Sequence, residues 1–148
     1  MGMVSKRIRL RGERGAATVN ALFDTGASKS LIRRDIALKV ARLLRAQTPW
    51  IFQLGDGKGK LKTSEMVGLV FQLKGVSIVH TFIVARNLSE EVIIGTDLMQ
   101  FWKVKPDPVR EDVVIDKKLI QLKLVHLSRL TRWSEGTAMG GAYPISSR

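Results

Sequence analysis

The chain has 148 residues, of which 45% are hydrophobic and none is cysteine. This length and apolar fraction suit one compact domain and exclude a chain that is disordered throughout. The lack of cysteine excludes disulfides, thiol nucleophiles and cysteine-ligated metals. The chain has only two histidines, which also excludes a histidine-rich metal site. We expect no metal and no other cofactor.

The formal net charge of +12 is concentrated at the two ends, in residues 1–14 and 117–148. Such basic ends are compatible with a weak contact with nucleic acid or with an acidic partner. The alternative is that they serve solubility alone. The longest apolar region, residues 67–85, is interrupted by Lys74 and His80. We therefore expect no membrane span, no export signal and a cytoplasmic protein.

Short segments that alternate polar and apolar residues, or form apolar runs between turn residues, are typical of β-strands. In chain order they are residues 7–11, 17–23, 50–54, 60–67, 69–73, 76–84, 92–94, 113–115 and 119–125. The last two are expected to pair as a hairpin.

Two short helices are also predicted. Residues 33–44 place their apolar side chains on one helical face, and Pro49 ends this stretch. A second helix runs through Trp102 and is capped by Thr96 or Asp97. The sequence thus predicts an all-β fold with one or two short helices over residues 1–127, followed by a basic, Gly/Ser-rich flexible tail over residues 128–148.

Several short motif matches do not hold. The Gly-rich stretch at residues 55–60 lacks the first glycine and the hydroxyl residue of a phosphate-binding loop, and it lacks later ligands of a calcium loop. A nucleophilic triad of Ser28 or Ser30 with His80 has no supporting nucleophile motif. His80 itself is expected to be a surface or lining residue.

Two segments carry a more specific pattern. Residues 22–28 read LFDTGAS and follow a predicted strand, and residues 92–98 read VIIGTDL and precede a predicted helix. A Gly-rich hairpin turn lies between them. In this order and spacing the chain resembles the retropepsin-like aspartic proteases over roughly residues 5–125. The resemblance implies a closed acid-protease-type β-barrel with a flap hairpin, forming a twofold homodimer.

The chemistry of such a site needs two carboxyls about 3 Å apart, and at this distance they cannot both ionise. The ionised carboxyl takes a proton from water, and the protonated carboxyl polarises the scissile carbonyl. The chain has a single Asp-Thr-Gly, at Asp24. A homodimer would bring two copies of Asp24 together at its axis. The predicted activity is therefore that of an aspartic endopeptidase.

The resemblance also assigns roles to neighbouring residues. Thr25 would hydrogen-bond across the axis, and Gly26 would bring its backbone N–H to the carboxylate. The turn Gly55-Asp56-Gly57 would form the flap. The residues implied in substrate binding are Leu22, Ala27, Ser28, Leu31, Gly55, Asp56, Gly57 and Ile93. Because the pocket positions are apolar, we expect a polypeptide substrate with apolar residues flanking the cut.

Some positions depart from the retroviral pattern. Ser28 and Lys29 stand where the viral enzymes commonly carry acidic residues, and Thr96 stands where many of them carry an arginine that pairs with the first of those acids. Ala27, in contrast, matches the retroviral form, whereas pepsin-like chains usually have serine there. Alanine cannot offer a hydroxyl to an ionised pair of carboxyls, so we expect an activity optimum at about pH 5–6.5. Residues 7–11 and 119–125 are both candidates for a terminal sheet shared by two subunits.

Two alternatives remain open at this point. The first is a catalytically weak or silent protease-like fold that acts as a dimerisation or peptide-binding module. The second is a basic β-barrel that binds nucleic acid, although the aromatic residues needed for base stacking make up only 6% of the chain.

Overall fold

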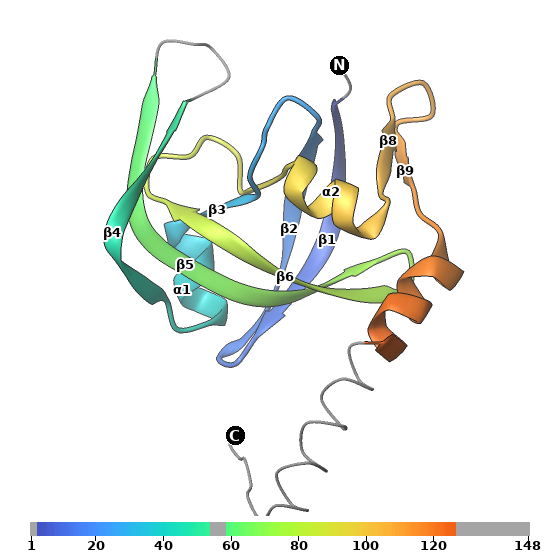
Figure 1. Ribbon diagram of the computed structural model, residues 1–148, viewed down its shortest axis with the longest axis horizontal. Helices are drawn as coiled ribbons and strands as arrows, with labels where there is room; N and C mark the ends of the chain where they lie inside the picture. Colours follow the sequence, from blue (N-terminus) through green and yellow to red (C-terminus); the bar gives the residue numbers. More distant parts are fainter. Residues whose placement is uncertain (1–2, 54–58, 127–148) are drawn as a thin grey trace, which may run out of the picture. The chain divides into compact units, whose positions relative to one another are not determined.

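The computed structural model describes residues 3–53 and 59–126 (Figure 1). Contacts within the chain define two compact units, the first ending at Ile115 and the second beginning at Asp116. None of the helices in the described ranges has the length and apolar character needed to cross a membrane. The Gly55-Asp56-Gly57 turn and the tail at residues 128–148 lie outside the described residues.

The first unit is a small β-barrel with short helices. Its elements in chain order are β1 (Met3–Gly12), β2 (Gly15–Asp24), β3 (Leu31–Arg33), α1 (Arg34–Val40), β4 (Leu44–Gln53), β5 (Lys60–Leu73), β6 (Val76–Ala85), β7 (Val92–Ile94), α2 (Thr96–Trp102), β8 (Lys105–Asp107) and β9 (Asp112–Val114). Six strands form a ring in the order β1-β2-β7-β3-β6-β5, which the pairing of β1 with β5 closes. β4 is added at the edge of β5. The expected closed barrel is confirmed.

The alternating pattern of the first strands explains their place in the ring. Val4, Ile8 and Leu10 of β1 are buried, while the residues between them face outward or lie partly exposed. β2 returns antiparallel from Gly15, directly opposite Gly12. The N-terminal hairpin is therefore confirmed, and both strands are longer than predicted.

β5 is one continuous strand of 14 residues, whereas the sequence pattern predicted two strands separated at Gly68. Gly68 is compatible with an uninterrupted strand because a side chain there would meet nothing within 4 Å. The predicted turn between β5 and β6 is confirmed. Lys74 and Gly75 both have positive φ, at 52° and 81°, as a tight hairpin turn requires.

The first predicted helix is too long. α1 ends at Val40, where Ala41 adopts an extended conformation and the N–H of Arg14 donates to the Val40 carbonyl at 2.9 Å. This contact with the first hairpin ends the helix before Leu44, which instead begins β4. Pro49 lies inside β4, where the register with β5 shifts, because proline cannot donate a ladder hydrogen bond.

The predicted hairpin of residues 113–115 and 119–125 is wrong. β9 pairs with β8, and residues 117–126 form a helix in the second unit. The Asp116 carboxylate accepts the Leu119 N–H at 3.0 Å, and this cap favours a helix over the strand that alternation predicted. Residues 119–125 therefore supply no strand to a shared sheet, and the described residues form three short helices rather than one or two.

Candidate active site

Asp24 is the last residue of β2 and lies at an edge where two parallel strands end together. β2 and β7 are parallel, with Leu22 opposite Ile93 and Phe23 opposite Ile94. The next residues in each strand, Asp24 and Gly95, consequently reach the same edge of the barrel. The side chain of Asp24 is half-buried there, and Thr25 and Gly26 beside it are exposed.

The loop after β2 folds back onto the Asp24 carboxylate. The Gly26 N–H donates to Asp24 Oδ1 at 2.8 Å, and the Ala27 N–H donates to the Asp24 carbonyl at 3.1 Å. The Thr96 N–H at the start of α2 donates to the Ala27 carbonyl at 2.8 Å. Backbone groups therefore fix the carboxylate and tie its loop to the helix.

Gly95 allows this close approach between the two segments. A Cβ at position 95 would lie 2.6 Å from the Lys29 carbonyl oxygen and 2.8 Å from that of Ala27. Those atoms are backbone and cannot move aside as a flexible side chain could, so only glycine fits without displacing the loop.

A buried polar network connects the end of this loop to neighbouring elements. Ser30 is 0% exposed, its hydroxyl donates to Asp97 Oδ1 at 2.8 Å, and the Gly95 N–H donates to the Ser30 hydroxyl at 3.0 Å. The Ser30 N–H donates to Asp97 Oδ2 at 3.2 Å, and His80 Nε2 of β6 lies 3.1 Å from the same oxygen. The network thus joins the loop to α2 and β6.

Asp97 carries the negative charge of this network. Burial raises the pKa of its carboxyl, but hydrogen bonds with His80, Ser30 and the Leu98 backbone outweigh burial and hold the pKa below its usual range. Asp97 does not cap α2 as expected. The N-cap position is Gly95, and no side chain caps that helix. The Asp97 side chain is instead engaged by Ser30 and His80.

This arrangement does not form a nucleophilic triad. Asp97 lies between Ser30 and His80, and both contact the carboxylate. No hydrogen bond joins Ser30 to His80 in the described part of the chain, so the imidazole is not placed to take a proton from the hydroxyl. Ser28 is exposed. Elsewhere in residues 3–53 and 59–126, no group of three His, Asp or Glu side chains could hold a metal ion.

Three of the predicted pocket residues form one row. Ile93 of β7 lies opposite Leu22 of β2 on one side and Leu31 of β3 on the other. Leu22 and Ile93 are half-buried, whereas Phe23, Val92 and Ile94 in the alternate positions are buried. Leu31 is also buried, at 8% exposed. Leu22 and Ile93 therefore lie on the less buried face of these strands, and Leu31 covers one end of the row.

The other predicted residues fall in two groups. Ala27 is half-buried and Ser28 is exposed, and both belong to the loop that holds Asp24. Gly55, Asp56 and Gly57 lie outside the described residues, although the strands leading to them pair as far as Gln53 and Lys60. The shared roles of Ser30, Gly95 and Asp97 were not predicted, because their closeness follows only from the pairing of β2, β3 and β7.

Known proteins share this architecture. A sequence profile of the family described as "Aspartyl protease" matches residues 8–98, which is more than half of the chain. The retroviral protease-like domain of Ddi1 from Leishmania major is similar in structure, with a TM-score of 0.55 and 19% identity over 79% of this chain and 87% of that one. The EIAV protease, solved with the inhibitor HBY-793, has a TM-score of 0.48 and 20% identity over 68% of this chain and 88% of its own.

No curated protein matches the sequence. The profile match covers the strand that ends in Asp24, the loop after it and the start of α2. The barrel order and the position of Asp24 at the edge of β2 agree with that match. The chain therefore belongs to the aspartyl protease family and has a retropepsin-like fold.

Proposed function

We propose that the protein is an aspartic endopeptidase in which water is activated between the Asp24 carboxyls of two identical subunits. The observation that carries this proposal is the half-buried Asp24 carboxylate at the edge of the barrel, held by the Gly26 N–H at 2.8 Å. Because the chain has one Asp-Thr-Gly, a second carboxyl of the same kind must come from a second copy.

In the proposed reaction the two carboxyls share one proton. The ionised carboxyl takes a proton from water as the water oxygen attacks the scissile carbonyl carbon, and the protonated carboxyl donates its proton to the carbonyl oxygen. As the diol collapses and the C–N bond breaks, one diol hydroxyl returns its proton to the second carboxyl, and the proton taken from water passes from the first carboxyl to the leaving amine. Hydrolysis is then complete, and the carboxyls again hold one proton.

A cavity beside Thr25 supports the proposed dimer. It has a volume of about 360 Å³, and its lining residues are Thr25, Thr96, Met99, Gln100, Lys103, Val104, Lys105 and Pro106. A hollow next to the Asp24 loop, lined by both apolar and polar side chains, is suited to receive a side chain from a second copy. In this proposal, Thr25 contacts the partner's loop across the twofold axis and holds the two carboxyls in register.

The proposed substrate is an extended polypeptide. Leu22, Leu31 and Ile93 form an apolar row on adjacent strands, which suits apolar side chains on either side of the cut. Ala27 and Ser28 lie in the Asp24 loop, where Ser28 is exposed and can hydrogen-bond a peptide backbone. We assign the flap role to Gly55, Asp56 and Gly57, where backbone N–H groups would meet substrate carbonyls.

Digestion of proteome-derived peptides at pH 5.5 tests the proposal, with Asp24→Asn as the matched variant. Asparagine keeps the shape of aspartate but cannot share the proton, so we expect cleavage by the wild type only. Size-exclusion chromatography checks that both forms have the same oligomeric state. Cleavage at equal rates by both forms would contradict the proposal. Peptide binding by the wild type without any cleavage would instead favour a silent peptide-binding module.

A further inference from the structure

A second cavity lies on the first unit between β5 and the segment that follows β6. Its volume is about 590 Å³. Its lining residues are Arg45, Lys60, Leu61, Lys62, Thr63, Ser64, Glu65, Ala85, Arg86, Asn87, Leu88 and Ser89. We call it the β5 basic cavity, because its lining has four cationic side chains and a single carboxylate, that of Glu65. None of these residues belongs to the Asp24 loop.

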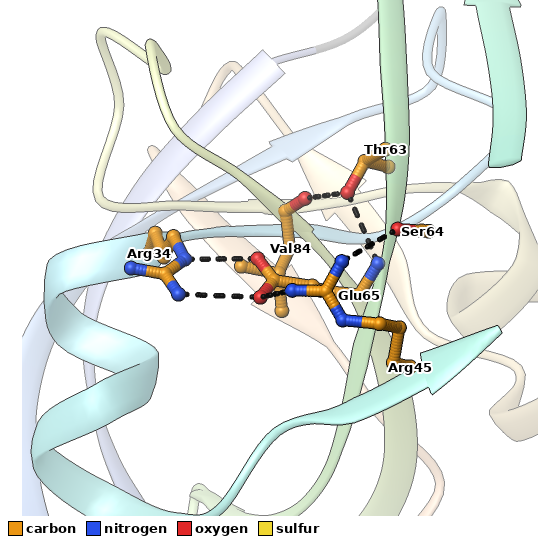
Figure 2. Close-up of polar contacts among 6 residues, drawn as sticks. All are labelled: Arg34, Arg45, Thr63, Ser64, Glu65 and Val84. Atoms are coloured by element: carbon orange, nitrogen blue, oxygen red, sulfur yellow. Dashed lines mark hydrogen bonds and ion pairs between the residues drawn. The ribbon is translucent and has the colours of Figure 1, made fainter.

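The Glu65 carboxylate is already neutralised (Figure 2). Arg34 Nε donates to Oε1 at 2.8 Å and Arg34 Nη2 to Oε2 at 3.2 Å, while Arg45 Nη2 donates to Oε2 at 3.2 Å. Glu65 is only 7% exposed. The hydrogen bonds from Arg34, together with the charges of Arg34, Arg45 and Arg86, hold the pKa of Glu65 below its usual range despite its burial. Glu65 is therefore an ionised, fully engaged group in the cavity wall.

Three cations remain for a ligand. Lys60, Lys62 and Arg86 are exposed, and none forms an ion pair with a carboxylate in residues 3–53 and 59–126. Lys60 and Lys62 are two residues apart on β5 and so point to the same side of that strand. Arg86 comes from the segment across the cavity. Four cations against one carboxylate give the lining a net positive charge, although the charge of Arg86 also acts on Glu65, and this net charge favours an anionic ligand.

The edge of β5 at this cavity has no ladder pairing over residues 60–65, and its bond to β6 there runs through a side chain, because the Thr63 hydroxyl donates to the Val84 carbonyl at 2.7 Å (Figure 2). Residues 60–65 lie on the part of β5 that pairs with β4, whereas pairing with β6 begins only at Met66, opposite Ile83 (Figure 1). The other edge of residues 60–65 is therefore unpaired in the described part of the chain. An extended peptide can lie along such an edge and place alternate side chains in the cavity.

We propose that the β5 basic cavity binds aspartate or glutamate side chains of the peptide substrate, at positions outside the apolar pair that flanks the cut. The proposal rests on the proposed endopeptidase function and adds acidic peptides as its preferred substrate class. An acidic peptide fits better than nucleic acid, since no aromatic residue lines the cavity for base stacking. Lys60, Lys62 and Arg86 would determine specificity without taking part in bond cleavage.

Binding is measured with two fluorescein-labelled peptides that share an apolar centre and differ in having glutamate or glutamine on both sides. The Asp24→Asn protein binds them without cleavage, so fluorescence anisotropy reports recognition alone. We expect the glutamate peptide to bind about tenfold more tightly, a preference that falls as salt is added. In the same background, Lys62→Gln with Arg86→Gln should reduce the ratio to about one.

The matched control is Arg9→Gln with Lys39→Gln, which removes the same charge from exposed positions on β1 and α1. It should keep the tenfold preference, and unchanged melting temperatures should show that all variants fold. Equal binding of the two peptides, absence of binding, or the same loss in the control would each overturn the proposal. Displacement of the glutamate peptide by a single-stranded oligonucleotide at lower concentration would also overturn it in favour of nucleic acid.

The two proposals fail in different ways. Cleavage is measured separately, on both peptides with the wild-type protein. If neither peptide is cleaved but the charge preference in binding is present, the endopeptidase proposal fails while the cavity keeps its role. If both peptides are cleaved with equal kcat/KM and bind equally, the endopeptidase proposal stands and the specificity proposal is refuted.

Discussion

Replacing Ser30 by alanine tests whether the buried network holds the Asp24 loop. The Ser30 side chain is fully buried and its hydroxyl joins Asp97 to the Gly95 backbone at 2.8 and 3.0 Å. Alanine keeps the volume of the site nearly intact. The substitution therefore removes the hydroxyl without creating a large cavity.

The expected loss follows from the two hydrogen bonds. A hydrogen bond to an ionised group contributes about 1.5–3 kcal/mol, and an unsatisfied buried N–H costs about 1–3 kcal/mol. Asp97 keeps its contacts with His80 and two backbone N–H groups, which compensates part of the first loss. We expect the free energy of unfolding to fall by about 3 kcal/mol, which lowers the melting temperature by about 6–12 °C.

Urea denaturation at pH 7, followed by tryptophan fluorescence, measures this change. Ser77→Ala on β6 is the matched control, because Ser77 is an exposed strand residue and its loss should change the stability by less than about 0.5 kcal/mol. A double-mutant cycle with Asp97→Asn should give a coupling of about 1–2 kcal/mol. If Ser30→Ala behaves like the control, the network does not support the loop and the reasoning is refuted.

Other predictions follow from the contacts around the barrel. Gly95→Ala should lower the free energy of unfolding by more than about 2 kcal/mol in urea denaturation, because the new Cβ would lie 2.6 Å from the Lys29 carbonyl oxygen. A variant as stable as the wild type would show that the loop can move. Glu65→Gln should lower stability by about 2 kcal/mol at pH 7, since it removes the ionised partner of Arg34. The pKa of Glu65 is lowered in the fold, so its contribution is complete above its ordinary value of 4.5 and is lost as pH falls below it. The difference between the wild type and this variant should therefore shrink between pH 7 and pH 3, and a constant difference would contradict the ion-pair account. Activity should be greatest at about pH 5–6.5, and an optimum below about pH 4 in a pH–rate profile would contradict the role given to Ala27.

Local patterns in the sequence were sufficient for much of the barrel. The alternation in β1, the Lys74-Gly75 turn and the apolar run of β7 each determine their own conformation, and the structure has all three. Asp24 could be singled out because its motif, the later VIIGTDL segment and their spacing agree. These features depend on residues close in sequence or on a motif of known order.

The errors arose where distant contacts decide the conformation. α1 ends at Val40 because the Arg14 N–H of the first hairpin donates a hydrogen bond to the Val40 carbonyl. The sequence of residues 33–44 alone does not predict that contact. The apolar spacing of residues 119–125 is compatible with a strand or a helix. The hydrogen bond from the Leu119 N–H to the Asp116 carboxylate caps a helix and favours that conformation.

The two polar sites could not be predicted from local sequence patterns either. Ser30 and Asp97 are 67 residues apart and meet only because β3 and β7 are neighbours. The β5 basic cavity likewise joins residues of β4 and β5 to a segment beyond β6. No period or spacing in the chain relates these residues to one another.

In the proposed dimer, each active site needs Asp24 from two chains. Subunits of wild type and Asp24→Asn, mixed and allowed to exchange, test it directly through the rate of peptide cleavage at constant total protein. If both carboxyls are required, activity falls as the square of the wild-type fraction, to about one quarter in an equal mixture. A linear fall to about one half would show that each chain works alone and would contradict the claim.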